Sequence, residues 1–362
     1  MEFPVQRPLV AALAALVFIA PAAYAMDATL DSLAEGGHWK QVRERVGPRT
    51  GANSTDHEAL YWMSRCLLAF GDKPGAQTFA VQAVALDGKN ARYHYQLADV
   101  LGSMAQDAGP LKGLGLAGRF KKEAERAIAL DPKLVGARRD LMEFYLVAPG
   151  IAGGDRKKAN AQADTIAQID PARGALAQAD LAIKDKKMDQ ADAIYRKAIA
   201  AWPHDYEVLL DAAGFYGSDS QKKWGMVDTL GKTAVEVQPD RVGGYSTLAQ
   251  LYAHQGRWDA LDSLLAVAEH ALPDNLNPTY QAGRVILTDG HEFERAERYF
   301  RKYLTQEAEG QSPTLAHAHW RLGLVLEKEG KKSDAVTEIE TAVRLKPDLD
   351  AAKKDLNRLK KA

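Results

Sequence analysis

Apolar and small residues recur along this 362-residue chain with a spacing far longer than a helical turn. The unit is clearest at 316–348, AHAHWRLGLVLEKEGKKSDAVTEIETAVRLKPD. Apolar positions three or four apart on both sides of Gly330 indicate two amphipathic helices, and Pro347 ends the unit. Glycine favours the left-handed turn that stops a helix. The pattern therefore predicts a helix, a tight turn and a second helix.

The same unit returns at 57–88 and at 242–274, with small residues where two helices would cross closely. A proline closes each successive unit from the one ending at Pro132 to the one ending at Pro273, and the interval from Pro273 to the next closing proline spans two units. About eight units are expected. The closing prolines are Pro132, Pro171, Pro203, Pro239, Pro273 and Pro347.

This spacing resembles the tetratricopeptide repeat family, whose unit is a helix pair of about 34 residues. The resemblance covers essentially all of the chain after residue 25; it is strong at 57–88 and 316–347 and weak at 135–171. It implies an all-α fold, a right-handed α-solenoid of antiparallel helix pairs. The stretch DLMEFYLVAPGIAGGD, 140–155, also resembles one found in secreted bacterial repeat proteins of unassigned role.

Four segments are expected on this basis. Residues 1–25 combine Arg7, an apolar run and the ending Ala-Tyr-Ala, the pattern of a secretory signal peptide cleaved after Ala25. Residues 26–56 contain a partial repeat, 57–347 the tandem repeats, and 348–362 a polar capping helix. The chain is thus expected in the periplasm or outside the cell, without stable membrane insertion after cleavage.

Charge and cysteine content narrow the function classes. The 47 basic and 48 acidic residues nearly cancel, so nothing favours nucleic acid as a partner. Cys66 is the single cysteine and is expected to be a small buried apolar residue. Intrachain disulfides are excluded, and packing must supply the stability.

Two glycine-rich stretches imitate nucleotide-binding loops. GLGLAG, 113–118, matches G-x-G-x-x-G, but the preceding residues have helical spacing where a dinucleotide site needs a strand. We expect it to be part of a loop inserted between two helices. GMVDTLGKT, 225–233, has five residues between its glycines where a phosphate loop has four, and it falls in a second helix. No cofactor is expected.

Metal and catalytic motifs are equally weak. GHEFE at 290–294 lacks the second histidine of a zinc motif, and His317 and His319 lie on diverging helix faces. No nucleophile elbow is present. No metal ligand or catalytic residue is therefore assigned, although carboxylates from distant repeats could still meet in the fold.

Two departures from the repeat are expected to be exposed loops, at 104–119 and 148–155. Neighbouring repeats place equivalent turns on one edge, so the two insertions should lie side by side. Asp155 is expected to cap the helix that follows. Loops on a rigid scaffold often carry function, although neutral drift in exposed turns is the alternative.

In the resembled family the first helices line a concave groove, and their fifth and ninth positions face the ligand. The family's carboxylate clamp of Lys and Asn does not appear as a set. Carried over to this chain, the two positions give Tyr61, Arg65, Tyr95, Asp99, Arg139, Glu143, Tyr280, Arg284 and, at the fifth position of the last repeat, Trp320.

The function expected from these features is a non-enzymatic scaffold that binds a peptide or a partner protein in the groove. A rival expectation is an enzyme or small-ligand binder whose site is formed by 104–119 and 148–155. An enclosed cavity with convergent titratable groups at those segments would favour the rival. A third expectation is an array that serves mainly to oligomerise. The oligomeric state is left open.

Overall fold

The computed structural model describes residues 22–310 and 313–361, and every regular element in these two ranges is helical. The predicted all-α fold of paired helices is confirmed. No helix of the described ranges is long and apolar enough to cross a bilayer. The predicted signal segment, 1–25, falls mostly outside the described residues, so its cleavage stays a prediction.

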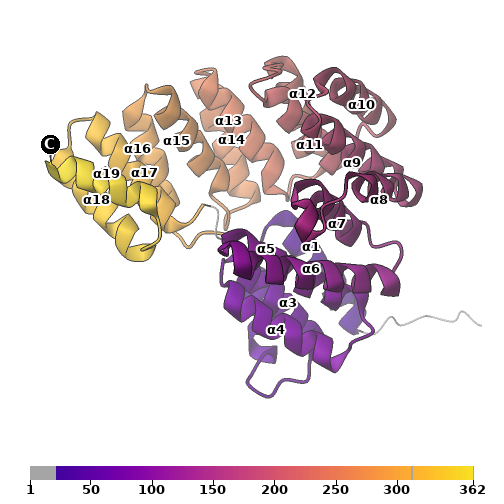
Figure 1. Ribbon diagram of the computed structural model, residues 1–362. Helices are drawn as coiled ribbons and strands as arrows, with labels where there is room; N and C mark the ends of the chain where they lie inside the picture. Colours follow the sequence, from indigo (N-terminus) through magenta and orange to yellow (C-terminus); the bar gives the residue numbers. More distant parts are fainter. Residues whose placement is uncertain (1–21, 311–312, 362) are drawn as a thin grey trace, which may run out of the picture.

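Antiparallel helix pairs follow one another along the chain (Figure 1). The first pair is α1 (Ala22–Gly36) and α2 (Trp39–Val46), and a single helix, α19 (Asp350–Lys361), ends the array. Short 3₁₀ helices η1 (Gly47–Arg49) and η2 (Gly150–Ala152) interrupt two of the connections. The pairs between are α3 (His57–Ala69) and α4 (Lys73–Leu86), α5 (Ala91–Asp107) and α6 (Pro110–Leu130), α7 (Val135–Val147) and α8 (Arg156–Ile169), α9 (Pro171–Lys184) and α10 (Met188–Ala201), α11 (Tyr206–Gly217) and α12 (Trp224–Val237), α13 (Val242–His254) and α14 (Trp258–Ala271), α15 (Asn277–Asp289) and α16 (Phe293–Tyr303), α17 (Leu315–Lys328) and α18 (Lys332–Leu345).

Aspartates begin many of these helices. The carboxylate of Asp56 accepts a hydrogen bond from the Ala59 backbone N–H at 3.0 Å, and Asp205 accepts from Val208 at 3.0 Å. Such caps satisfy backbone donors that the first helical turn leaves free. Asp170 alone links α8 to α9, and Pro171 then occupies the first turn of α9, where its missing N–H costs nothing.

The tight turns inside the pairs use the left-handed conformation predicted for Gly330. Its φ is +79°, and Gly71, Gly256 and Gly290 have φ values of +84°, +63° and +81°. The α9–α10 turn adopts the same conformation at Lys186, with φ +59°, although this residue has a Cβ. The backbone turn is therefore a property of the repeat and persists where glycine is missing.

Close crossing of the two helices in a pair requires small residues, as the spacing predicts. A Cβ on Gly323 of α17 would lie 2.4 Å from the Ile339 side chain of α18. In the α3–α4 pair, the buried Ser64 hydroxyl donates to the Ala76 carbonyl at 2.8 Å. Each pair buries such residues against the next, and the largest buried cluster extends from Ala172 to Leu359.

The array is curved, with the odd-numbered helices on its inner side. From α9 to α17 each odd-numbered helix contacts the following odd-numbered helix. The even-numbered helices instead contact the odd-numbered helices before and after them in the chain. In Figure 1, α9 and α11 lie inside the arc and α10 and α12 outside. Because the odd-numbered helices pack directly on one another, the inner side of the array is shorter than the outer side, and the array bends.

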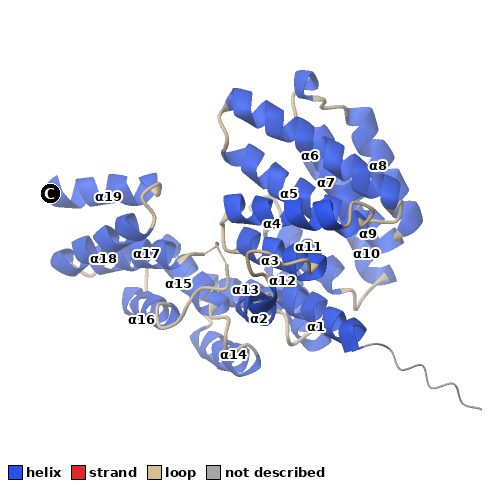
Figure 2. Ribbon diagram, turned by 90° about the horizontal axis from the view of Figure 1, so that it is seen from below, coloured by secondary structure: helices blue, strands red, loops and turns tan. Residues whose placement is uncertain are grey.

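The bend brings the first pair against loops from the other half of the chain. His38 Nδ1 lies 2.9 Å from Asp274 Oδ2, Gln41 donates to the same carboxylate at 2.8 Å, and Arg43 forms an ion pair with Glu307 at 2.7 Å. Figure 2 shows α1 and α2 beside α13 and α14. We call these contacts the ring contact, comprising residues 35–43 and their partners at 240–241, 274 and 307–309.

The segment 104–119 is not the loop that the sequence predicts. Helix α5 continues to Asp107 and α6 begins at Pro110, so GLGLAG lies within a 21-residue helix. Leu116 and Phe120 of this extension are buried in the core formed by α5 to α8. Glycine is a poor helix former, but this tertiary packing outweighs its local cost.

The loop at 148–155 is observed as predicted. Asp155 caps α8 by accepting from the backbone N–H groups of Lys157 at 2.9 Å and Lys158 at 3.2 Å. Helix α6 contacts η2, so the two departures from the repeat do lie side by side.

Candidate functional site

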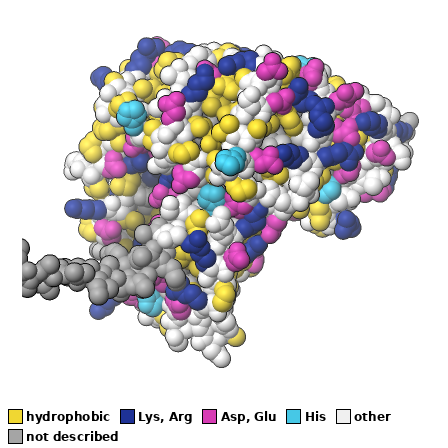
Figure 3. All heavy atoms as spheres, turned by 180° about the vertical axis from the view of Figure 1, so that it is seen from behind, with side chains coloured by type: hydrophobic (Ala, Val, Ile, Leu, Met, Phe, Trp, Pro, Cys, Tyr) yellow, Lys and Arg dark blue, Asp and Glu magenta, His cyan; other side chains and the backbone are white. Residues whose placement is uncertain are grey.

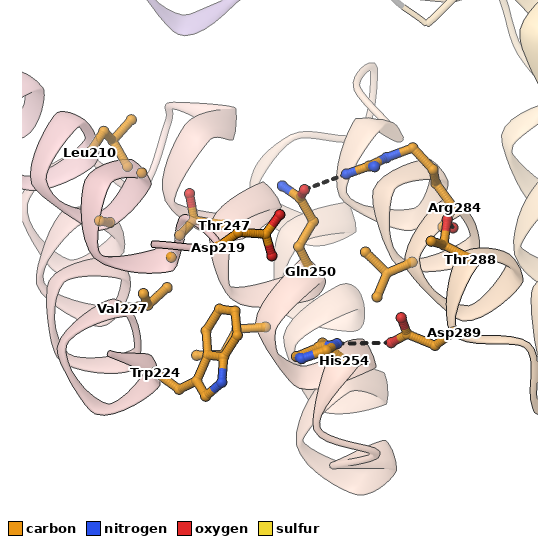
Figure 4. Close-up of a pocket in the computed structure, with 15 residues that line it drawn as sticks. Leu210, Asp219, Trp224, Val227, Thr247, Gln250, His254, Arg284, Thr288 and Asp289 are labelled. Atoms are coloured by element: carbon orange, nitrogen blue, oxygen red, sulfur yellow. Dashed lines mark hydrogen bonds and ion pairs between the residues drawn. The ribbon is translucent and has the colours of Figure 1, made fainter. Parts of the chain in front are cut away.

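An open hollow of about 470 Å³ crosses the inner helices α11, α13 and α15. Figure 4 shows Leu210, Val227 and Trp224 on one side of it and Arg284 with Asp289 on the other. Side chains of α13 form the surface between them. Because the hollow spans three successive pairs, a bound segment lying in it would cross several repeats.

The polar groups of the hollow are held in place by neighbours on adjacent helices. His254 Nδ1 lies 2.9 Å from Asp289 Oδ2, and the centroids of the His254 and Trp224 rings are 5.0 Å apart. Arg284 donates to Gln250 Oε1 at 2.5 Å and to Gln281 Oε1 at 2.8 Å. Figure 4 shows the His254–Asp289 and Gln250–Arg284 pairs as dashed lines.

Arg284 retains an uncompensated positive charge. Both of its hydrogen-bond partners are neutral amides, and burial together with the nearby cation of Arg321 lowers the pKa of its guanidinium. A cation that is half-buried beside another cation gains from an anionic group brought by a partner. This end of the inner face is therefore suited to a carboxylate.

The inner face of α5 to α11 has the opposite sign. Arg139 bridges Asp180 at 3.2 Å and Asp211 at 3.3 Å, so one cation serves two carboxylates. Burial, and then the neighbouring Asp99, raise the pKa of Asp140 to about 6. Asp99 is itself exposed, yet the surrounding protein desolvates its carboxyl and raises its pKa. These acids line a hollowed surface where water screens them less than on a convex one.

Four of the predicted partner-binding residues belong to this acidic face. Tyr95 lies beside Asp140, and its ring fits against Gly136, where a Cβ would lie 2.8 Å from the Tyr95 hydroxyl oxygen. Asp99 and Glu143 are exposed, and Arg139 is paired as described. The structure thus brings Tyr95, Asp99, Arg139 and Glu143 onto adjoining helices, and their role in binding stays a prediction.

Four others are engaged within the protein. Tyr61 and Tyr280 are 6% and 3% exposed, and Tyr280 accepts a hydrogen bond from Arg321 at 2.7 Å. Arg65 stacks over the rings of Trp62 and of Trp39 from the first helix pair. Trp320 donates to Asp355 of the capping helix at 2.9 Å. Each of these side chains packs neighbouring repeats together, which is the other use of aromatic and arginine residues in such arrays.

Arg284 is the one predicted residue that lines the hollow, and three important neighbours were missed. His254 and Asp289 lie near the ends of their helices, beyond the fifth and ninth positions, and Trp224 begins a second helix. A helix-end histidine next to a tight turn has no distinctive sequence pattern. Its pairing with Asp289 depends on how α13 and α15 are aligned.

A second hollow, of about 430 Å³, is a shallow surface around Lys186–Gln190. Neither of these two hollows includes a residue of the inserted segments 104–119 and 148–155. No three His, Cys, Asp or Glu side chains come together in a metal-binding arrangement within 22–310 or 313–361. The two hollows therefore do not support the rival expectation of an enclosed catalytic or small-ligand site at these segments.

Comparison with known proteins adds to this picture. Residues 316–349 match the family described as tetratricopeptide repeat. No curated protein matches the sequence. Among solved structures, yeast Tom70 aligns at 13% identity and a TM-score of 0.45, covering 94% of this chain and 88% of Tom70. A thermophilic tetratricopeptide repeat protein of Thermus thermophilus aligns at 21% identity and a TM-score of 0.41, covering 54% of this chain and 95% of that one.

A tetratricopeptide repeat protein of Parabacteroides merdae aligns at 14% identity and a TM-score of 0.41, covering 84% of this chain and 98% of that one. The family match itself covers the α17–α18 pair, which repeats the turn and crossing seen in the earlier pairs. The chain is thus an all-α protein of paired helices that carries a tetratricopeptide repeat at residues 316–349.

Proposed function

We propose that this protein is a non-enzymatic scaffold that binds an extended peptide or a segment of a partner protein along the inner side of its helix array. The observation that carries the proposal is the open hollow across α11, α13 and α15. Its volume of about 470 Å³ is within the usual range for binding pockets. Tetratricopeptide repeats typically bind protein partners, which supports the same conclusion.

The chemistry of the inner face indicates what such a partner presents. Leu210, Trp224 and Val227 offer an apolar wall, and Arg284 offers a cation across from it. An apolar side chain followed by a carboxylate would satisfy both. The acidic face around Asp99 and Asp140 suits basic residues further along the same partner.

We also propose that the protein acts in the periplasm or outside the cell. The support is the pattern of residues 1–25, in which an apolar run follows Arg7 and ends in Ala-Tyr-Ala. Mass determination of the N-terminus of the protein recovered from its native cells tests this. An N-terminus at Met26 supports export, and retention of residues 1–25 contradicts it.

Site-specific crosslinking tests the groove. A photo-reactive amino acid at Gly214, which lines the hollow with open space around its Cα, should capture a partner in the native cell. The same amino acid at exposed Val267 of the outer helix α14 serves as the matched control. Capture at both positions alike, or at neither in a folded protein, contradicts the proposal.

Affinity then tests the chemistry with the segment so identified. Arg284→Gln should weaken binding by at least about tenfold, because it removes the charge and keeps much of the hydrogen-bonding shape. Arg301→Gln, on α16 and paired with Glu297, is the control and should leave the affinity unchanged. Equal affinity of the Arg284 variant and the original protein would remove the hollow from the proposed site.

A further inference from the structure

The most exposed large apolar side chains of the described residues gather at one edge of the molecule. Leu111 is 89% exposed and Ile151 is 92% exposed, and Leu114 and Val147 are exposed beside them in the sequence. The remaining exposed large apolar residues are spread over α4, α12, α14 and α18. Figure 2 shows the α5–α6 turn and the loop between α7 and α8 at the same edge of the array. Figure 3 shows the molecule from behind Figure 1, and on that face apolar and charged side chains are intermingled.

The fold holds these side chains outward. Helix α6 has 21 residues where α4 has 14, so its first turns project beyond the neighbouring pair. The loop that carries Ile151 is fixed by backbone hydrogen bonds, including Gly153 N–H to Gly150 O at 3.0 Å and Asp155 N–H to Tyr145 O at 2.9 Å. Ile151 is therefore exposed on an ordered turn and has no apolar neighbour to cover it.

The loop and the projecting helix also form one surface. The rings of Phe120 and Phe144 pack 5.5 Å apart beneath it, and α6 contacts η2 directly. A Cβ on Gly154 would lie 1.8 Å from the Ala148 carbonyl oxygen, so no other residue fits this turn without moving it. The edge thus carries its exposed apolar side chains on a turn and a helix that are held in place by these contacts.

Basic side chains surround these points. Lys112, Arg119, Lys122 and Lys157 are exposed and form no ion pair with another described residue. The acidic side chains nearby are engaged elsewhere: Asp107 pairs with Lys73 at 2.5 Å, and Asp155 caps α8. The edge therefore presents an excess of positive charge.

We infer that this edge, comprising Leu111, Leu114, Val147 and Ile151 with Lys112, Arg119, Lys122 and Lys157, docks the protein on the surface of an anionic phospholipid bilayer. Exposed apolar side chains flanked by cations match a layer of acyl chains beneath phosphate groups. Neither of the two hollows described above includes a residue of this edge, so nothing here favours a peptide partner. Binding is reversible, because a few apolar side chains and four cations make a shallow anchor.

Insertion of a labelled side chain tests this inference in the full chain. Ile151→Cys, and Val267→Cys as the matched control, are each labelled with a polarity-sensitive dye. The native Cys66 is buried, and burial raises the pKa of its thiol to about 12, so the dye reacts at the introduced cysteine. The probe membranes are vesicles of phosphatidylcholine alone and of equal parts phosphatidylcholine and phosphatidylglycerol.

The dye at position 151 should shift to the blue with the anionic vesicles and not with the neutral ones, and the dye at position 267 should not respond. Because the dye reports only on its own surroundings, attachment of the protein to the vesicles through residues 1–25 would not by itself shift the emission of the dye at position 151. In a further series, Lys112→Gln with Lys122→Gln should reduce the dye response at 151 at least about fivefold, whereas Lys89→Gln should leave it unchanged. No shift at 151, equal shifts at 151 and 267, or a shift that follows self-association in light scattering without vesicles would overturn the inference.

Discussion

Lys186 adopts the left-handed backbone conformation that glycine supplies in several other tight turns, with φ +59° against +79° at Gly330. Its side chain is exposed and makes no side-chain hydrogen bond or ion pair with another described residue, so nothing offsets the local strain. A side chain with a Cβ in this region costs about 1 kcal/mol. Lys186→Gly should therefore stabilise the protein by up to about 1 kcal/mol, measured as a higher midpoint of urea unfolding.

Gly330→Ala is the converse change and should destabilise by about 1 kcal/mol, since it introduces a Cβ at φ +79° in open space. A lower midpoint for the Lys186 variant would mean that the turn is held by something other than its backbone conformation. The glycine rule of this repeat was predictable from sequence. The positions at which the chain departs from that rule, Lys186 and Lys222, were not, because a lysine at a turn looks like any solvated residue.

Helix α6 is the element for which local pattern and structure disagree. Gly115 and Gly118 lie within it, and a Cβ at either position would meet no atom within 4 Å. Each glycine costs a helix about 1 kcal/mol relative to alanine. Gly115→Ala and Gly118→Ala should therefore each raise the free energy of unfolding by about that amount.

Gly102→Ala in α5 is the control, because its Cβ would lie 3.2 Å from the Phe120 ring and should bring no gain. If 113–118 were an irregular loop, the two alanines would leave stability unchanged or lower it, and helix-sensitive circular dichroism would not increase. Composition alone favours a loop here. The segment is helical because Leu116 and Phe120 are buried, and they are buried against apolar side chains of α5 and α7.

The ring contact joins the two halves of the chain, and its charges predict how it responds to pH. Burial raises the pKa of Glu309 to about 7 from its ordinary 4.5, so the stability that its protonated form contributes is lost as pH rises from about 4.5 to about 7. The hydrogen bond to Asp274 raises the pKa of His38 above 6.5, and its contribution is also lost as pH rises past that shifted pKa. Burial by itself would raise the pKa of Asp274, but hydrogen bonds from His38 and Gln41 outweigh burial and lower that pKa to about 2. The stability that ionised Asp274 gives the ring contact is therefore lost as pH falls from about 4 toward 2.

The ring contact should therefore be most stable near pH 4 to 5 and weaker at pH 8. Hydrogen exchange of the amides at 38–43 and 304–310, corrected for intrinsic rates, should be faster at pH 8 than at pH 5.5. Glu309→Gln should reduce this difference in exchange rate, because glutamine does not ionise between pH 5.5 and pH 8. Lys40 Nζ, 3.6 Å from Glu309 in the original protein, would then lose its charged partner at both pH values. Equal protection at both pH values, with the protein folded at each, would show that the contact does not depend on these groups.

Helix pairs, their tight turns and their closing prolines are local features, and the sequence alone determined them because the repeat spacing, small residues and glycine act within one unit. Of the predicted binding residues, Arg284 lines the hollow, whereas Tyr61 and Tyr280 are buried between repeats. Only the tertiary structure decided this, together with the helical state of 113–118, the pairing of His254 with Asp289 and the contact of His38 with Asp274. The helical state of 113–118 depends on the burial of Leu116 and Phe120. The contacts between repeats depend on the angle between successive pairs, a small rotation that accumulates over the array and that no single repeat encodes.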